Sequence, residues 1–220
     1  ARGGSSNCRI PMVPIARHMD VDHTLDDWQR LGPSIPLLCD VQPAGRFLGE
    51  KFHRAGGVPA VMKELLGAGR LNAGAMTVTG RTVAENLANT PDGDREVIRA
   101  YGNPMKEAAG YVVMSGNLFD SAVMKISVID QDFRTRFLSN PDRPNVFEGR
   151  AVVFDGPEDY HHRIEDPSLD IQEQSVLVIR NCGPVGYPGS AEVVNMQPPA
   201  YLMKKGIMTL PTMGDGRQSG

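Results

Sequence analysis

The spacing of apolar residues in the first ninety positions predicts mainly helices. Ile10 to Met19 has apolar side chains at three- and four-residue intervals, and Thr24 can cap a second helix whose acidic first turn favours the positive helix end. The short apolar run Leu37 to Val41 follows Pro36, which cannot continue a helix, and it predicts a buried strand. Further helices are predicted over residues 45–54, 60–66 and 82–87.

The pattern changes after a segment rich in turn-forming residues. Nothing in residues 89–94, Asn-Thr-Pro-Asp-Gly-Asp, can bury apolar surface, so we expect a hinge there and a domain boundary within residues 90–110. Beyond this segment the chain contains several short predicted strands, and strands at such spacing are typical of a barrel or sandwich. Predicted helical inserts at residues 157–163 and 199–205 make the carboxy-terminal half α/β. The predicted fold class is α/β, with domains over residues 1–100 and 101–220. The strands are expected over residues 111–114, 122–126, 149–154 and 175–180.

The composition excludes some classes of partner. With 220 residues and 40% hydrophobic content, the chain can bury a sizeable core. Its net charge of -3 comes from 23 basic and 26 acidic residues without long runs of one sign, which predicts no binding of nucleic acid or anionic membrane. No stretch reaches the roughly 18 to 20 consecutive apolar residues that span a bilayer, and the first residues do not form a signal peptide. We expect a cytoplasmic protein.

The cysteines and histidines form no recognisable metal motif. Cys8, Cys39 and Cys182 are odd in number, far apart and outside any CxxC pair, so we expect buried free thiols and no disulfide, zinc or self-contained cluster site. His161 and His162 are adjacent, so on a helix their side chains point about 100° apart and cannot hold one ion.

Two other clusters have structural explanations. Asp155, Glu158 and Asp159 form an acidic turn, which we interpret as a helix N-terminus that favours negative charge. Gly56 and Gly57 could bind an anion at the start of the next helix, but the end of the preceding helix explains the glycines equally well.

The densest candidate for chemistry is the loop from Gly183 to Glu192, which follows the apolar run Val176 to Arg180. Its three glycines and two prolines fix an unusual backbone whose N–H groups can face an anion, and the loop delivers the carboxylate of Glu192 at its far end. The alternative is a complicated turn that closes a barrel, with Glu192 as a solvated carboxylate. Composition alone leaves both interpretations open.

A second glycine-rich turn, Leu210 to Gly220, holds Asp215, Arg217 and Ser219 within five positions. It lacks the G-x-S-x-G elbow, and no well-placed histidine follows, which disfavours a serine-hydrolase triad. Free alkoxide is negligible at neutral pH, so the Ser219 hydroxyl would need a nearby cation or helix N-terminus to lower its pKa. A plain turn with a capping serine is the alternative.

Five stretches in a fixed order resemble one family. They lie at residues 3–7, 52–61, 116–118, 183–189 and 215–220, and together they resemble the dihydroxy-acid and sugar-acid dehydratases, which include the dihydroxy-acid, phosphogluconate, arabinonate and xylonate enzymes. Residues 188–199 resemble the arabinonate and xylonate enzymes more than the branched-chain biosynthetic ones. Residues 119–121, Phe-Asp-Ser, depart from the Ala-Pro-x-Gly usual in the biosynthetic enzymes.

The resemblance implies a hydro-lyase that removes water from a 2,3-dihydroxy carboxylate, here a pentonate such as arabinonate or xylonate, to give a 2-keto-3-deoxy acid. It implies an iron–sulfur cluster, 2Fe–2S or 4Fe–4S, acting on the departing 3-hydroxyl, and Mg²⁺ holding the carboxylate end. On matching positions, Glu192 resembles the Mg²⁺-ligating glutamate and Ser219 the serine whose alkoxide removes the C2 proton. Arg217 is our own hypothesis for a residue that binds substrate carboxylate, from its position two residues before the serine.

The resemblance also implies an architecture. The chain would contain the end of an α/β metal-binding domain, followed by a swivelling β-barrel-like (β/β/α) domain, in a homo-oligomer that is a dimer or tetramer. The family's cluster cysteines and other Mg²⁺ ligands lie upstream of these motifs, so Cys8, Cys39 and Cys182 are not assigned as ligands. The abrupt start and end predict a segment of a longer protein that cannot assemble the site alone.

Three alternatives remain open from the sequence. The chain could be a non-catalytic interaction or oligomerisation module of the same fold, or part of a dihydroxy-acid dehydratase of branched-chain amino-acid synthesis. It could also be a small-molecule anion-binding domain that uses the glycine loops.

Overall fold

The computed structural model describes residues 1–129, 131–183, 186, 192–193 and 196–218. By its internal contacts the chain divides into two units, residues 1–129 and 130–220. The predicted boundary between residues 100 and 101 stays a prediction. Within the described residues, no helix combines the length and apolar character needed to cross a membrane.

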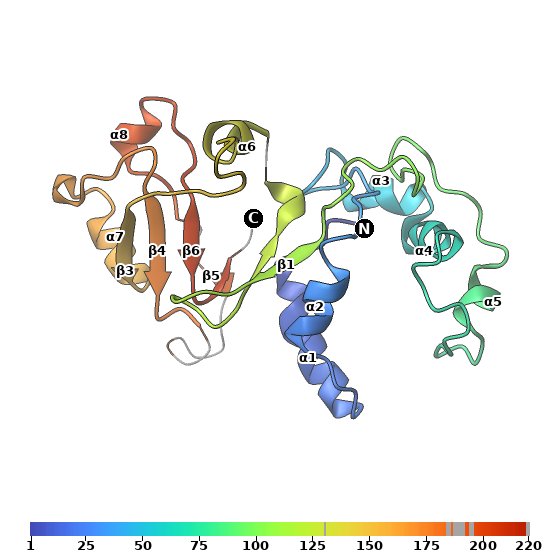
Figure 1. Cartoon of the computed structure of the whole chain (residues 1–220). Helices are drawn as coiled ribbons and strands as arrows, with labels where there is room; N and C mark the ends of the chain where they lie inside the picture. Colours follow the sequence, from blue (N-terminus) through green and yellow to red (C-terminus); the bar gives the residue numbers. More distant parts are fainter. Residues whose placement is uncertain (130, 184–185, 187–191, 194–195, 219–220) are drawn as a thin grey trace. The chain divides into compact units, whose positions relative to one another are not determined.

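The regular elements of the first unit are mainly helices, as the apolar spacing predicts, and a small antiparallel β-hairpin lies near its end (Figure 1). Its elements are η1 (Ser6–Cys8), α1 (Arg9–His18), α2 (Leu25–Leu31), α3 (Gly49–Arg54), α4 (Gly57–Gly67), α5 (Val83–Leu87), β1 (Tyr111–Met114), β2 (Ala122–Lys125) and η2 (Ile126–Val128).

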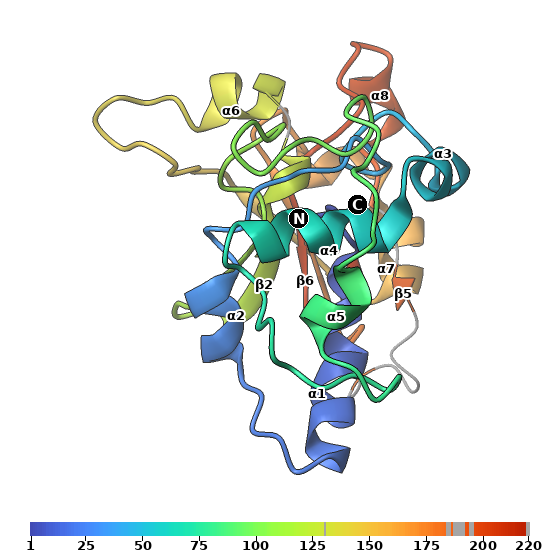
Figure 2. The same cartoon turned by 90° about the vertical axis from the view of Figure 1, so that its right-hand side faces the viewer.

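Helix starts in this unit follow from local chemistry. The carboxylate of Asp27 accepts the backbone N–H of Thr24 at 3.0 Å, which confirms the predicted start of α2. At α5 the arrangement is reciprocal: Thr82 Oγ1 accepts the N–H of Glu85 at 3.2 Å, and Glu85 Oε2 accepts the N–H of Thr82 at 2.7 Å. Gly56 has φ +108°, a conformation open to glycine, and lets α4 follow directly from α3 (Figure 2).

The predicted strand over Leu37 to Val41 is buried as expected, but it forms isolated bridges instead of a regular ladder. Leu37, Cys39 and Val41 bridge to three different segments, at Lys106, Ile98 and Phe47. A ladder requires one partner strand in register, and here each backbone group finds a separate partner. The segment packs in a core that consists of Leu38, Cys39, Val41, Phe52, Ala55, Ala60, Val61, Val97 and Ile98.

The second unit has a parallel three-stranded sheet in the order β3-β4-β6 (Figure 1). Strand β3 alternates exposed and buried positions, and its buried Val152 and Phe154 lie opposite the buried Leu177 and Ile179 of β4. Tyr160, on α7, packs edge-on against Phe154 at a ring-centroid distance of 5.4 Å. The elements are α6 (Gln131–Phe137), β3 (Ala151–Asp155), α7 (Pro157–Arg163), η3 (Pro167–Leu169), β4 (Val176–Arg180), β5 (Glu192–Val193), α8 (Ala200–Met203), β6 (Thr212–Gly214) and β7 (Arg217–Gln218).

The mixed α/β class is confirmed, whereas a closed barrel, one of the two arrangements expected from strand spacing, does not form among the described residues. Their strands form sheets of two, three and two strands, with no closed barrel. The helix between β3 and β4 supplies the crossover that a parallel pair requires, so these strands do not meet as an antiparallel hairpin. Helix α6 and strands β5, β6 and β7 were not predicted, because they are too short or too polar to give a clear period.

Candidate active site

Strand pairing brings two of the three predicted site residues together. Glu192 begins β5 and Arg217 begins β7, and the two strands pair in parallel with Glu192 opposite Arg217 and Val193 opposite Gln218. The structure describes the backbone of these four residues and not their side chains. Ser219 and most of the Gly183–Glu192 loop lie outside the described residues.

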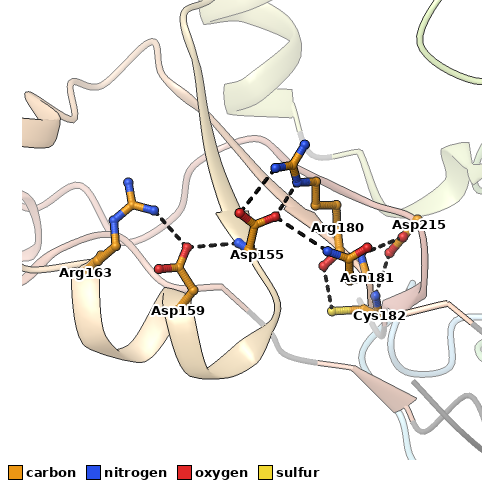
Figure 3. Close-up of polar contacts among 7 residues, drawn as sticks. All are labelled: Asp155, Asp159, Arg163, Arg180, Asn181, Cys182 and Asp215. Carbon is orange, nitrogen blue, oxygen red and sulfur yellow. Dashed lines mark hydrogen bonds and ion pairs between the residues drawn. The ribbon is translucent and has the colours of Figure 1, made fainter. Parts of the chain in front are cut away.

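Asp215, to which the sequence analysis assigns no role, joins the segments that lead to Glu192 and to Arg217. Asp215 Oδ2 accepts the backbone N–H of Asn181 at 2.7 Å, and Asp215 Oδ1 accepts that of Cys182 at 2.9 Å (Figure 3). A Cβ atom added to Gly183 would lie 2.7 Å from the backbone oxygen of Asp215, so only glycine permits this approach of the two backbones. The end of β4 and the β6–β7 turn are thus held together at the backbone.

The sequence offered only a weak signal for this role. Aspartate is common in turns, where its side chain bonds backbone groups nearby, and Asp215 precedes a glycine. Its observed partners lie 33 and 34 residues earlier in the chain. A local pattern cannot identify partners at that separation.

Asp155, the last residue of β3, and Arg180, the last residue of β4, extend this polar cluster (Figure 3). The carboxylate of Asp155 pairs with Arg180, including a 3.2 Å contact from Arg180 Nη2, and accepts a long 3.5 Å hydrogen bond from Asn181 Nδ2. The hydrogen bond and charge of Arg180 lower the pKa of Asp155 and, reciprocally, raise the pKa of Arg180. Both side chains are more than half exposed, so solvent screens the pair and its stabilising effect is small.

The acidic turn has the structural role that the sequence indicates. Asp159 lies in the first turn of α7, accepts the backbone N–H of Asp155 at 2.9 Å and pairs with Arg163 at 2.8 Å. Negative charge here faces the positive end of the helix. Asp155 and Asp159 already have partners, so their positions are explained without a ligand.

The three cysteines are free and do not form a metal site among the described residues. Cys39 and Cys182 are buried as expected, but the prediction is wrong for Cys8, which is exposed. Burial raises the pKa of Cys39 to about 11. Burial, and then the negative charges of Asp215 and Glu158, raise the pKa of Cys182. In the part of the chain that the structure describes, no three or more histidine, cysteine, aspartate or glutamate side chains are grouped so that they could hold a metal ion.

The first unit contains a mainly apolar cavity of about 300 Å³, and the described residues that line it all belong to that unit. Trp28, Leu31 and Ile35 form part of its wall, together with the half-buried Lys125. Ser127 also lines it, and its buried hydroxyl has no hydrogen-bond partner among the residues that the structure describes.

Comparison with known proteins identifies the family over nearly the whole chain. Residues 1–86 match the amino-terminal domain, and residues 96–220 the carboxy-terminal domain, of the dihydroxy-acid/6-phosphogluconate dehydratases. The chain is 59% identical over 220 residues to D-xylonate dehydratase of Caulobacter vibrioides. It is 39% identical over 221 residues to L-arabinonate dehydratase of Rhizobium leguminosarum, and 39% identical over 225 residues to dihydroxy-acid dehydratase of Methylibium petroleiphilum.

These alignments cover all of this chain but only 37%, 36% and 37% of the respective relatives, so the chain spans a little over a third of their length. Both family domains are represented, in the family's order. The chain therefore belongs to the dihydroxy-acid/6-phosphogluconate dehydratase family.

Proposed function

We propose that this chain is part of a hydro-lyase that dehydrates a sugar acid, a pentonate such as xylonate or arabinonate, to a 2-keto-3-deoxy acid. The higher identity to a D-xylonate dehydratase than to a dihydroxy-acid dehydratase, 59% against 39%, supports a pentonate over a branched-chain substrate. The structural observation that carries the proposal is the pairing of Glu192 with Arg217 across β5 and β7.

This pairing limits how far the proposed base can be from the proposed metal ligand. Adjacent strands lie about 4.8 Å apart. Two peptide links join Arg217 to Ser219, and two links span at most about 7 Å. The strand spacing and the reach of two peptide links together set an upper limit of about 12 Å on the Cα separation of Glu192 and Ser219. That separation is compatible with two side chains that act on one small substrate.

The chemistry of Glu192 fits a magnesium ligand. Mg²⁺ prefers oxygen ligands and is commonly held by one or two carboxylates together with water and substrate. The described residues contain no group of three or more acidic, histidine or cysteine side chains that could hold a metal. We therefore assign one ligand, Glu192, to this chain and the others to the remainder of the protein. Bound Mg²⁺ would supply positive charge that favours the alkoxide form of Ser219 and acidifies the C2 proton.

The cysteines of this chain do not fit an iron–sulfur cluster. Cluster iron binds thiolates, but burial raises the pKa of both Cys39 and Cys182, which favours their neutral thiols. Cys39 and Cys182 also belong to different units. A cluster of either type, 2Fe–2S or 4Fe–4S, would take its ligands from elsewhere in the protein.

Two residues of this chain would act on the substrate directly. The Ser219 alkoxide takes the proton from C2, and the electron pair of that C–H bond forms the C2–C3 double bond as the 3-hydroxyl departs. The resulting enol gains a proton at C3 and loses the proton of its 2-hydroxyl, which gives the 2-keto acid. The departing hydroxide takes up the proton that Ser219 removed from C2 and leaves as water, which restores the alkoxide. The guanidinium of Arg217 pairs with the substrate carboxylate and orients C2 toward the base.

The proposal includes the family's architecture. Residues 1–100 would end an α/β metal-binding domain, and residues 101–220 would belong to a swivelling domain. The full-length protein would act in the cytoplasm as a homo-oligomer, a dimer or a tetramer.

Steady-state kinetics of the full-length protein with S219A tests the proposal. Wild type should convert D-xylonate or L-arabinonate to a 2-keto-3-deoxy acid, and S219A should lose at least about 1,000-fold in kcat, since no other group would take the C2 proton. S139A removes a different serine hydroxyl, one that bonds the carbonyl of Thr135, and should keep normal kcat.

If S219A retains turnover while its metal content is intact, the assignment of Ser219 as the base is rejected. Preference for a branched 2,3-dihydroxy acid would instead support a dihydroxy-acid dehydratase. No turnover of any sugar acid or dihydroxy acid by a metal-loaded wild-type protein would support a non-catalytic module.

A further inference from the structure

The carboxylate of Asp215 uses both oxygens on consecutive backbone N–H groups. Oδ2 accepts from Asn181 at 2.7 Å and Oδ1 from Cys182 at 2.9 Å, so the carboxylate is fixed in position and in rotation. Asp215 is exposed, so packing in a hydrophobic core does not explain the fixed position of its side chain. Each bond has one ionised partner, which makes it stronger than a bond between neutral groups.

Backbone contact reinforces this connection. Gly183 lies so close to Asp215 that an added Cβ atom would be 2.7 Å from the backbone oxygen of Asp215. Asn181, Cys182 and Gly183 are consecutive, so the three residues that follow β4 all lie against one residue of the β6–β7 turn. Figure 3 shows the contacts of Asn181 and Cys182 with Asp215.

The two segments joined here are those that carry the proposed chemistry. Gly183 begins the loop that ends at Glu192, and Asp215 lies two residues before Arg217 and four before Ser219. Beyond the contact, the same two segments pair again as β5 and β7. We infer that Asp215 is a positioning residue, which sets the register between the segment of the metal ligand and the segment of the base. This inference rests on the proposed function.

Loss of this contact would act through geometry. A displacement of about 1 Å of a reacting group can reduce a rate about 100-fold. Removing a group that orients a metal ligand typically weakens metal affinity about 10- to 100-fold. Asparagine keeps one acceptor oxygen for one of the two N–H groups, so D215N should be less impaired than D215A.

The test compares D215A, D215N, E192Q and S219A in the full-length protein. It measures kcat, KM, binding of Mn²⁺ as a spectroscopic probe, and hydrogen exchange at the amides of Asn181 and Cys182. D166N is the matched control, because the exposed carboxylate of Asp166 also accepts a backbone N–H, that of Ser168 at 2.8 Å, in the same unit.

We expect D215A to lose about 100-fold in kcat and D215N about 10-fold, with KM changed less than kcat. Affinity for Mn²⁺ should fall about 10-fold in D215A, and exchange at Asn181 and Cys182 should accelerate, while D166N changes none of these. A D215A protein with wild-type kcat and Mn²⁺ affinity overturns the inference. So does a loss of activity that is fully explained by a smaller folded fraction.

The proposed function fails on different observations. An inactive wild type or an active S219A would reject it, whereas Mn²⁺ binding and amide exchange report on Asp215 without turnover. If S219A is inactive and D215A is normal, only the role of Asp215 is wrong.

Discussion

The Cα atom of Glu192 lies opposite that of Arg217 in the parallel pairing of β5 with β7, although the two residues are 25 positions apart in the sequence. The intervening chain includes α8 and β6, so the pairing is a tertiary contact. This pairing places the backbone of Arg217 beside that of Glu192, the proposed metal ligand. A residue proposed to bind the substrate carboxylate would need such a position.

Replacing Arg217 with alanine in the full-length protein should raise KM for a pentonate about 10- to 100-fold, because a hydrogen bond to a charged group contributes about 1.5–3 kcal/mol. R217K should be intermediate, since lysine keeps the charge and loses the planar pair of donors. Steady-state kinetics checks both variants. R81A, which changes an exposed arginine of the first unit, serves as control. Unchanged KM in R217A would show that another group binds the carboxylate.

Replacing Gly183 with alanine should separate Asp215 from the end of β4. The added methyl would lie 2.7 Å from a backbone oxygen, which cannot move as freely as a side chain. Overpacking of this kind costs about 1–3 kcal/mol. Differential scanning calorimetry should show a lower Tm for G183A, and kcat should fall with it. G102A is the control, because an added Cβ there meets nothing within 4 Å. A G183A protein that matches G102A in both measurements would contradict the close approach.

Asp40 and Arg46 should contribute pH-dependent stability to the first unit. Asp40 is 2% exposed, and its oxygens accept the Arg46 N–H and Nε–H, each at 2.7 Å. Burial acts to raise the pKa of Asp40, but the hydrogen bonds from Arg46 outweigh burial and lower it below the ordinary 3.8. R46A should lose about 1.5 kcal/mol near pH 7, because the carboxylate keeps only its backbone partner, while solvent at the exposed Arg46 side chain weakens the pair.

The direction of the pH dependence follows from the lowered pKa. The stabilisation is fully present above the unfolded pKa of Asp40 and is lost as pH falls through the lower folded pKa. The Tm difference between wild type and R46A should therefore narrow below about pH 4. R54A is the control, since Arg54 pairs with an exposed Glu50 and should change Tm little. If the Tm difference between wild type and R46A stays constant below about pH 4, the stability loss of R46A comes from lost packing and not from the ion pair.

Cys39 should resist alkylation in the native protein. Burial raises its pKa to about 11, so at pH 8 only about one thiol in 1,000 is ionised, and the side chain is also fully buried. Iodoacetamide labelling followed by peptide mass spectrometry should show Cys39 modified only after denaturation, and C39A should remove the signal. Rapid labelling of Cys39 in the folded protein would contradict its burial.

The sequence predicted the elements whose signals are local. Thr24 and Thr82 precede acidic residues that complete the helix starts, and the apolar runs at β1 to β4 are long enough to indicate strands. The motifs in family order also identified the family, which the domain matches confirm. Glu192, Arg217 and Ser219 were chosen from residue type and motif, and their roles stay predictions.

Only the tertiary structure decided how these pieces meet. The apolar run at residues 37–41 indicates burial but not which segments bridge to it, and the short β5 and β7 carry no period at all. The partners of Asp215 lie 33 and 34 residues away, where no local pattern reaches. Helix caps and apolar periods depend on neighbours within a few residues and can be read from the chain. Strand pairing and long-range hydrogen bonds depend on the whole packed unit, because their energy is gained only when distant backbone segments find one register.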